Sequence, residues 1–203
     1  MVEALQAALA ALSGWEVAAV VLAIAYLLLA VREHPACWPC ALASTAIYTV
    51  LLWHVSLLME SALNVYYMAM AVYGWWAWRR GDAGNALAIT SWRARQHAVA
   101  IGTIAALTLA SGAWLSAHSN AAWPFLDSFT TWGAVLTTWM VARKVLENWL
   151  YWLVLDAVSI PLYVDRGLVL TAALFAIYLV LAVIGFLTWH RHYAASADAV
   201  VAT

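Results

Sequence analysis

The sequence predicts an all-α integral membrane protein with seven transmembrane helices. Hydrophobic residues make up 67% of the chain and charged residues 9%, and the mean hydropathy is +0.86. Soluble domains contain about 25% charged residues, so this composition is typical of a chain that lies in a bilayer. A third observation is an internal repeat, in which similar blocks of sequence recur at a fixed separation.

Seven apolar segments are long enough to span a bilayer. They are predicted at 15–31, 36–54, 57–78, 97–115, 125–143, 145–164 and 167–189. Several connections are only a few residues long, so neighbouring helices are expected to form antiparallel hairpins. The 203 residues are therefore expected to form one membrane domain, 1–203, without a large soluble part.

The repeat predicts that the helices are arranged as three plus one plus three. The block AVYGWWAWRR begins at Ala71 and AVIGFLTWHR begins at Ala182, an offset of 111 (182 less 71). The same offset pairs Trp38 with Trp149, Thr45 with Asp156, Tyr67 with Tyr178, Gly74 with Gly185 and Trp78 with Trp189. The repeats would cover 15–78 and 125–189, with 97–115 as a linker helix. The linker makes the two repeats parallel, as in SWEET-type sugar transporters.

The basic residues predict the orientation of the chain. With the N-terminus outside, eight of the nine lie on the cytoplasmic side: Arg32, Arg79, Arg80, Arg93, Arg95, Arg143, Lys144 and Arg191. Only Arg166 falls outside, and cytoplasmic loops are enriched in Lys and Arg. The N-terminus is therefore expected to be periplasmic and the C-terminus cytoplasmic. The longest connection, 79–96, is interpreted as a cytoplasmic linker on anionic lipid headgroups, and the alternative is a solvated charged loop with no function beyond topology.

The stretch ENWLYWLVLDAVSIPLY, residues 147–163, carries most of the candidate site. Trp149, Trp152, Asp156, Ser159 and Tyr163 are three or four residues apart and share one helix face, which Asn148 flanks. A carboxylate inside a membrane helix costs roughly 2.5–3.5 kcal/mol, so Asp156 should face protein or a wet cavity. The pattern predicts a site for a polar, aromatic small molecule. The alternative is a helix interface joined by polar side chains, with Trp149 at the headgroup level.

The third span adds two candidates, Asn64 and Tyr67, which lie on one face of that helix. The predicted substrate-binding residues are thus Asn64, Tyr67, Asn148, Trp149, Trp152, Asp156 and Ser159. For Asn64 the alternative is an interhelical hydrogen bond.

Other classes of function receive less support from the sequence. The net charge of −1 argues against nucleic acid as a partner, and no GxxxxGK[ST] loop is present to drive transport with ATP. Cys37 and Cys40 form CWPC, a spacing that redox pairs and half zinc sites use. A membrane thiol oxidoreductase is the rival function, but that class relays electrons between two cysteine pairs. We therefore expect no enzyme activity, no cofactor and no metal.

Three blocks resemble the PnuC family of nicotinamide riboside transporters. They are NVYYMAMAVYGWWAWRR from Asn64, WGAVLTTWMVARKVLENW from Trp132 and ENWLYWLVLDAVSIPLYVDRGL from Glu147, and the resemblance covers nearly the whole chain after about Trp15. It implies a vitamin transporter of the bacterial inner membrane with a SWEET-like fold and homotrimeric assembly. It also implies facilitated diffusion of nicotinamide riboside, followed by trapping through cytoplasmic phosphorylation.

The resemblance supports Asn148, Trp149, Trp152 and Asp156 in the sixth span, and Asn64, Tyr67, Gly74 and Trp78 in the third. Trp149 or Trp152 would stack on the cationic ring of the substrate, while Asn64 and Asn148 would bind its polar groups. Many members have Gln near the position of Asn64, and Asn reaches one methylene less. A related vitamin such as thiamine is therefore the alternative substrate.

Overall fold

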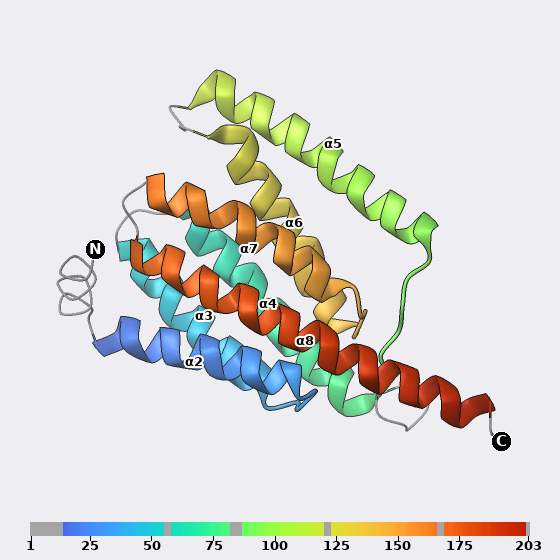
Figure 1. Ribbon diagram of the computed structural model, residues 1–203. Helices are drawn as coiled ribbons and strands as arrows, with labels where there is room; N and C mark the ends of the chain where they lie inside the picture. The colour runs from blue at the N-terminus through green and yellow to red at the C-terminus, as the bar shows by residue number, and fades with distance from the viewer. Residues whose placement is uncertain (1–13, 55–57, 82–86, 120–122, 166–168, 202–203) are drawn as a thin grey trace.

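The computed structural model describes residues 14–54, 58–81, 87–119, 123–165 and 169–201. These residues form seven α-helices (Figure 1): α2 (Gly14–Val31), α3 (Cys37–His54), α4 (Leu58–Arg80), α5 (Ala94–His118), α6 (Pro124–Ala142), α7 (Asn148–Asp165) and α8 (Val169–Val201). Each predicted span corresponds to one of them, so the all-α, seven-helix fold is confirmed. Arg166, the one basic residue predicted to lie outside, is not among the described residues.

Three of the described helices are by themselves long and apolar enough to cross a bilayer. They are Gly14–Val31, Ala94–His118 and the Thr171–Ser196 part of α8. The helices that fall short of this standard include α6 and α7, which bury the polar side chains Thr137, Thr138, Asn148, Asp156 and Ser159. Burial in the protein allows such helices to lie within a bilayer despite their polar groups.

We refer to α2, α3 and α4 as the first unit and to α6, α7 and α8 as the second unit, with α5 beside α6. α3 contacts α2 and α4 in the first unit, and α7 contacts α6 and α8 in the second. Contacts of α4 with α6 and of α2 with α8 join the two units. The main packing partner of α5 is α6, and His97 of α5 also lies 3.0 Å from the Tyr151 hydroxyl of α7. Figure 1 shows α5 at the outer side of the bundle.

The predicted helix boundaries differ from the structure most at α5, which runs from Ala94 to His118, at the start of α7 and at the end of α8. α7 begins at Asn148 and not at 145. Lys144 has a left-handed backbone with a φ of 50°, and Val145 then pairs with Thr90 in an isolated β-bridge. α8 continues well past the predicted end of the last span at 189 and runs to Val201. The alanine-rich sequence after Trp189 favours this extension, since alanine has the highest helix propensity.

The described part of the connection before α5 is attached to the protein, and its predicted position on headgroups stays a prediction. This part includes Thr90, whose N–H donates to the Lys144 carbonyl at 3.0 Å and whose carbonyl accepts from the Leu146 N–H at 2.8 Å. Glu147 adds further contacts by accepting hydrogen bonds from the Ser91 hydroxyl and the Trp92 N–H. The segment is therefore fixed to the loop between α6 and α7.

The same packing contact occurs in both units. A side chain at Gly74 would overlap the ring of Trp38, and one at Gly185 would overlap the ring of Trp149. The two glycines therefore allow α4 to approach α3, and α8 to approach α7, at the face of a buried indole. The offset of 111 relates the two contacts, because it pairs Trp38 with Trp149 and Gly74 with Gly185.

Four tryptophans form the centre of the core: Trp38, Trp78, Trp149 and Trp189. Trp38 and Trp78 are nearly perpendicular with ring centroids 5.4 Å apart, and Trp149 and Trp189 have the same arrangement at 5.4 Å. The rings of Trp78 and Trp189 meet at 6.0 Å, which links the two units. Edge-to-face pairs of this kind add about 0.5–1.5 kcal/mol each beyond their buried area.

Candidate substrate-binding site

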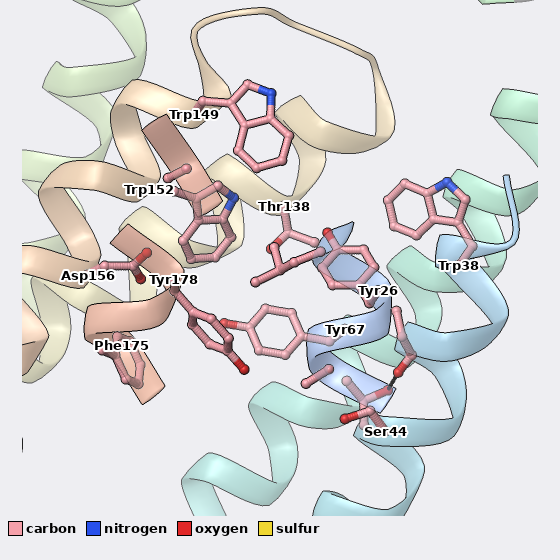
Figure 2. Close-up of a pocket in the computed structure, with 15 residues that line it drawn as sticks. Tyr26, Trp38, Ser44, Tyr67, Thr138, Trp149, Trp152, Asp156, Phe175 and Tyr178 are labelled. Carbon is pink, nitrogen blue, oxygen red and sulfur yellow. Dashed lines mark hydrogen bonds between the residues drawn. The ribbon is translucent and has the colours of Figure 1, made fainter. Parts of the chain in front are cut away.

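A cavity of about 240 Å³ lies between the two units (Figure 2). It is lined by Ala23, Tyr26, Leu27, Trp38, Ala41, Ser44, Thr45 and Tyr67 of the first unit and by Thr138, Trp149, Trp152, Asp156, Phe175, Tyr178 and Ala182 of the second. We refer to it as the central cavity. Its lining is aromatic and aliphatic with a few polar groups, which is the usual composition of a small-molecule site.

Four of the seven predicted substrate-binding residues line the central cavity. They are Tyr67 on α4 and Trp149, Trp152 and Asp156 on α7. Helical spacing explains the three on α7, because positions three and four apart lie on one face. The helix thus presents two indoles and a carboxylate to the same space.

The other three predicted residues are not among those that line the cavity. Asn148 is fully buried at the start of α7, where its Nδ2 donates to the Val145 carbonyl at 2.6 Å. The Ser159 hydroxyl donates to the Leu155 carbonyl of its own helix at 2.8 Å. Asn64 is half-buried on α4. Their role in substrate binding stays a prediction.

Asp156 is the one carboxylate among the described residues that line the central cavity. The residue is 3% exposed, and no described group donates a hydrogen bond to its carboxylate. Figure 2 shows its carboxylate beside the indole of Trp152. A buried carboxylate is costly without a partner, so this position favours a ligand that brings a positive charge or hydrogen-bond donors.

The two α7 tryptophans have different surroundings. Trp149 is 1% exposed, packs on Gly185 and Trp189, and has an indole N–H without a partner among the described residues. Figure 2 shows that its nitrogen-bearing edge points away from the middle of the cavity. Trp149 is therefore a core residue that closes one end of the site, and its alternative position at the headgroup level stays a prediction. Trp152 is half-buried and also lines the cavity.

Sequence reasoning left several lining residues out of the predicted site. The aromatic ones are Tyr26, Trp38, Phe175 and Tyr178. The offset of 111 would have found two of them, because it pairs Trp38 with Trp149 and Tyr67 with Tyr178. Tyr26 and Phe175 have no aromatic equivalent, and only the packing of α2 and α8 brings them to the cavity.

Charged residues and tryptophans close one end of the bundle, which we call the Lys144 end. The Trp78 indole N–H donates to the Ala142 carbonyl of the other unit at 3.2 Å, and the Trp189 N–H donates to the Ala30 carbonyl at 3.1 Å. Lys144 Nζ lies 4.7 Å from the centroid of the Trp78 ring. The two units are thus held together at this end by hydrogen bonds in both directions.

The two cysteines of the CWPC motif lie in the first turn of α3. Cys37 is buried in the core, Cys40 is half-buried, and both are free thiols. Within the described residues no three His, Cys, Asp or Glu side chains gather as metal ligands would. Neither cysteine lines the central cavity.

The sequence family described as nicotinamide mononucleotide transporters matches residues 13–191 of the chain. The chain belongs to this family. The family is one of transporters and not of enzymes, which confirms the predicted resemblance and places the chain among multi-pass membrane proteins.

Two characterised relatives of this transporter-family chain carry different vitamins. It is 30% identical over 131 residues to the riboflavin/roseoflavin transporter RibM of Streptomyces davaonensis, a match that covers 60% of this chain and 59% of that protein. It is 22% identical over 175 residues to the nicotinamide riboside transporter PnuC of Escherichia coli, covering 73% of each. The chain thus spans about three fifths of the length of the riboflavin transporter and more of PnuC.

A solved structure has the same fold. The crystal structure of the vitamin B3 transporter PnuC matches with a TM-score of 0.72 and 21% sequence identity, and the match covers 89% of this chain and 82% of that chain. The similarity extends over nearly all of the described helices, so this family member has the PnuC fold.

Proposed function

We propose that this protein is a vitamin transporter that takes up nicotinamide riboside by facilitated diffusion through the central cavity. The observation that carries the proposal is Asp156, a buried carboxylate without a partner among the described residues, in a cavity lined by aromatic rings. Nicotinamide riboside joins a cationic pyridinium to a ribose. Its ring provides the charge, and its hydroxyls and carboxamide provide the hydrogen bonds that this lining can accept.

Trp152 is the side chain best placed to stack on the substrate ring. Its indole is half-buried and lies beside Asp156 in Figure 2, so one ring could contact the aromatic face and the carboxylate together. A desolvated cation–π contact is worth about 2 kcal/mol. The hydroxyls of Tyr26, Tyr67 and Tyr178 are then available to the ribose.

The charge of the cavity argues against a nucleotide as substrate, although the family is described by one. Within the described part of the chain no Lys or Arg lines the cavity, and Lys144 is already paired with Glu33. A phosphate would meet Asp156 and no cation, which is unfavourable in a low-dielectric site. Cytoplasmic phosphorylation would therefore trap the product inside the cell without any further machinery in this chain.

Riboflavin is the second candidate, because RibM is 30% identical to this chain. Its isoalloxazine ring is uncharged, whereas nicotinamide riboside and thiamine are cations. Asp156→Asn keeps the shape of the side chain and removes its charge. The variant should weaken binding of the two cations about tenfold or more and leave riboflavin nearly unchanged.

The test is a titration of the purified protein with nicotinamide riboside, thiamine, riboflavin and nicotinamide mononucleotide. Asp165→Asn is the matched control, since Asp165 is an exposed carboxylate at the far end of the same helix. Preferred binding of nicotinamide riboside, lost in the Asp156 variant alone, supports the proposal. Tighter binding of riboflavin or of the nucleotide would overturn the choice of substrate.

Facilitated diffusion has a separate test in liposomes. Labelled substrate should equilibrate across the membrane without an imposed ion gradient, and a proton or sodium gradient should not concentrate it. Uptake that requires either gradient would contradict this part of the proposal. Replacement of Cys37 and Cys40 by Ser should leave uptake unchanged, and a loss of uptake would instead favour the thiol oxidoreductase.

We also propose the two-repeat arrangement, a location in the bacterial inner membrane and a periplasmic N-terminus. The equivalent Trp–Gly contacts in the two units support the repeat, and the distribution of basic residues supports the orientation. A reporter fused after Thr203 should be active in the cytoplasm and not in the periplasm. The homotrimer stays a prediction from the family resemblance, to be checked by the mass of the detergent-solubilised complex.

A further inference from the structure

The two walls of the central cavity are unequal at positions that the offset of 111 makes equivalent. In the repeat alignment Trp38 corresponds to Trp149 and Tyr67 corresponds to Tyr178, so these positions have the same residue type. Residue 41 differs, because Ala41 on α3 corresponds to Trp152 on α7 (152 less 41 is 111). Both Ala41 and Trp152 line the cavity.

The difference between Ala41 and Trp152 determines which side of the cavity has space for a ligand. α3 presents Trp38, Ala41 and Thr45 to the cavity, and α7 presents the equivalent Trp149, Trp152 and Asp156. Figure 2 shows the labelled α3 residues Trp38 and Ser44 on the side of the cavity opposite Trp152 and Asp156. An indole at position 41 would occupy space that a methyl group leaves empty. The α3 wall is therefore recessed where the α7 wall projects.

Hydrogen bonds give the recessed wall a defined polarity. The Thr45 hydroxyl donates to the carbonyl of Ala41 at 2.8 Å, and the Ser44 hydroxyl donates to the Ala19 carbonyl at 2.8 Å. Each hydroxyl has thereby committed its hydrogen and retains only lone pairs as acceptors. The wall around Ala41 can accept hydrogen bonds from a ligand, but its two hydroxyls have no hydrogen left to donate.

We propose that Ala41 is the specificity-determining residue that sets how large a ring system can lie against Trp152. The inference rests on the proposed function, because it concerns the substrate of the same cavity. A flat ring stacked on Trp152 extends toward α3, and the side chain at position 41 limits that extension. The ring then lies beside Asp156, and donor hydroxyls of the ligand can reach the acceptors of Ser44 and Thr45.

The proposal is tested by enlarging residue 41 in steps, with Ala41→Val and Ala41→Leu. The ligands are nicotinamide riboside, thiamine and riboflavin, which contain one ring, two linked rings and three fused rings. For each ligand that the wild type binds, Kd should rise with the size of residue 41. The ligand with the largest ring system should lose affinity about tenfold or more in Ala41→Leu. A single methylene in a tight pocket already changes specificity by about 10–200-fold.

Ala43→Leu is the matched control, because Ala43 is exposed on the same helix and does not line the cavity. A melting temperature of the ligand-free Ala41→Leu protein equal to or above that of wild type would show that leucine fills existing space. The inference would be overturned if the wild type binds a ligand and Ala41→Leu has the same Kd for it as Ala43→Leu. The proposed function would then remain intact. A wild type that binds none of the three ligands would overturn the proposed function, and the role of Ala41 with it.

Discussion

Glu33 and Lys144 form an ion pair across the two units, with Lys144 Nζ 2.8 Å from Glu33 Oε2. The two residues are equivalent at the offset of 111 (144 less 33), and both have left-handed backbones with φ of 54° and 50°. The same turn therefore ends the first helix of each unit, with opposite charges at matching positions. Partial burial raises the pKa of the Glu33 carboxyl, but the bonds and charges of Lys144 and His192 outweigh it and lower that pKa overall.

Removing the lysine of this pair should destabilise the protein. Lys144→Ala leaves Glu33 in its partly buried position and also removes the cation above the Trp78 ring. We expect a loss of about 1–3 kcal/mol in the free energy of unfolding, the usual cost of a buried polar group without its partner. Thermal melting in detergent measures it. Arg143→Ala is the control, since Arg143 is exposed, and an equal loss in both variants would contradict a special role for the pair.

Acid should remove the contribution of Glu33. Its pKa in the folded protein lies below the ordinary value of 4.5, so the ion pair stabilises the fold above that pH. The contribution disappears as the pH falls through the lowered pKa. Melting temperatures of wild type and Glu33→Gln should therefore differ at pH 7 and converge toward pH 3. A difference that stays constant over this range would show that Glu33 acts through packing and not through its charge.

The two equivalent glycines should respond alike to substitution. Gly74→Ala drives a methyl group into the Trp38 ring and Gly185→Ala drives one into the Trp149 ring. Each should lower stability by about 1–3 kcal/mol through overpacking. Gly102→Ala is the control, because a side chain there meets nothing within 4 Å and alanine favours the helix by about 0.5–1 kcal/mol. Tolerance of alanine at one of the two sites would argue against equivalent packing in the two units.

The two α7 tryptophans should separate binding from folding. Trp152→Ala should weaken the binding of nicotinamide riboside by about 2 kcal/mol, or roughly thirtyfold in Kd, and Trp152→Phe should keep part of the affinity. Trp149→Ala should mainly lower the melting temperature, because Trp149 is 1% exposed and packed on Gly185. Titration and melting of each variant measure the two effects. Wild-type binding by Trp152→Ala would exclude Trp152 as the stacking residue.

The sequence by itself determined the fold class and most of α7's part in the site. Apolar length defines a membrane helix because a bilayer has a fixed thickness, so all seven helices could be located. Helical periodicity placed Trp149, Trp152 and Asp156 on one face, because positions three and four apart must align. The boundary at Asn148 could not be predicted, since the residues before it pair through their backbone with Thr90, a segment remote in the sequence.

Only the tertiary structure decided which polar residues reach the central cavity. Asn148 and Ser159 belong to the predicted pattern, yet their side chains bind carbonyls of the chain near their own positions. Tyr26, Ala41 and Phe175 carry no local signal, and they line the cavity because α2, α3 and α8 pack around it. Periodicity fixes how residues are arranged around one helix axis, whereas the direction that a helix face points depends on its neighbours. A cavity between helices is therefore a property of their packing, which no single stretch of the chain encodes.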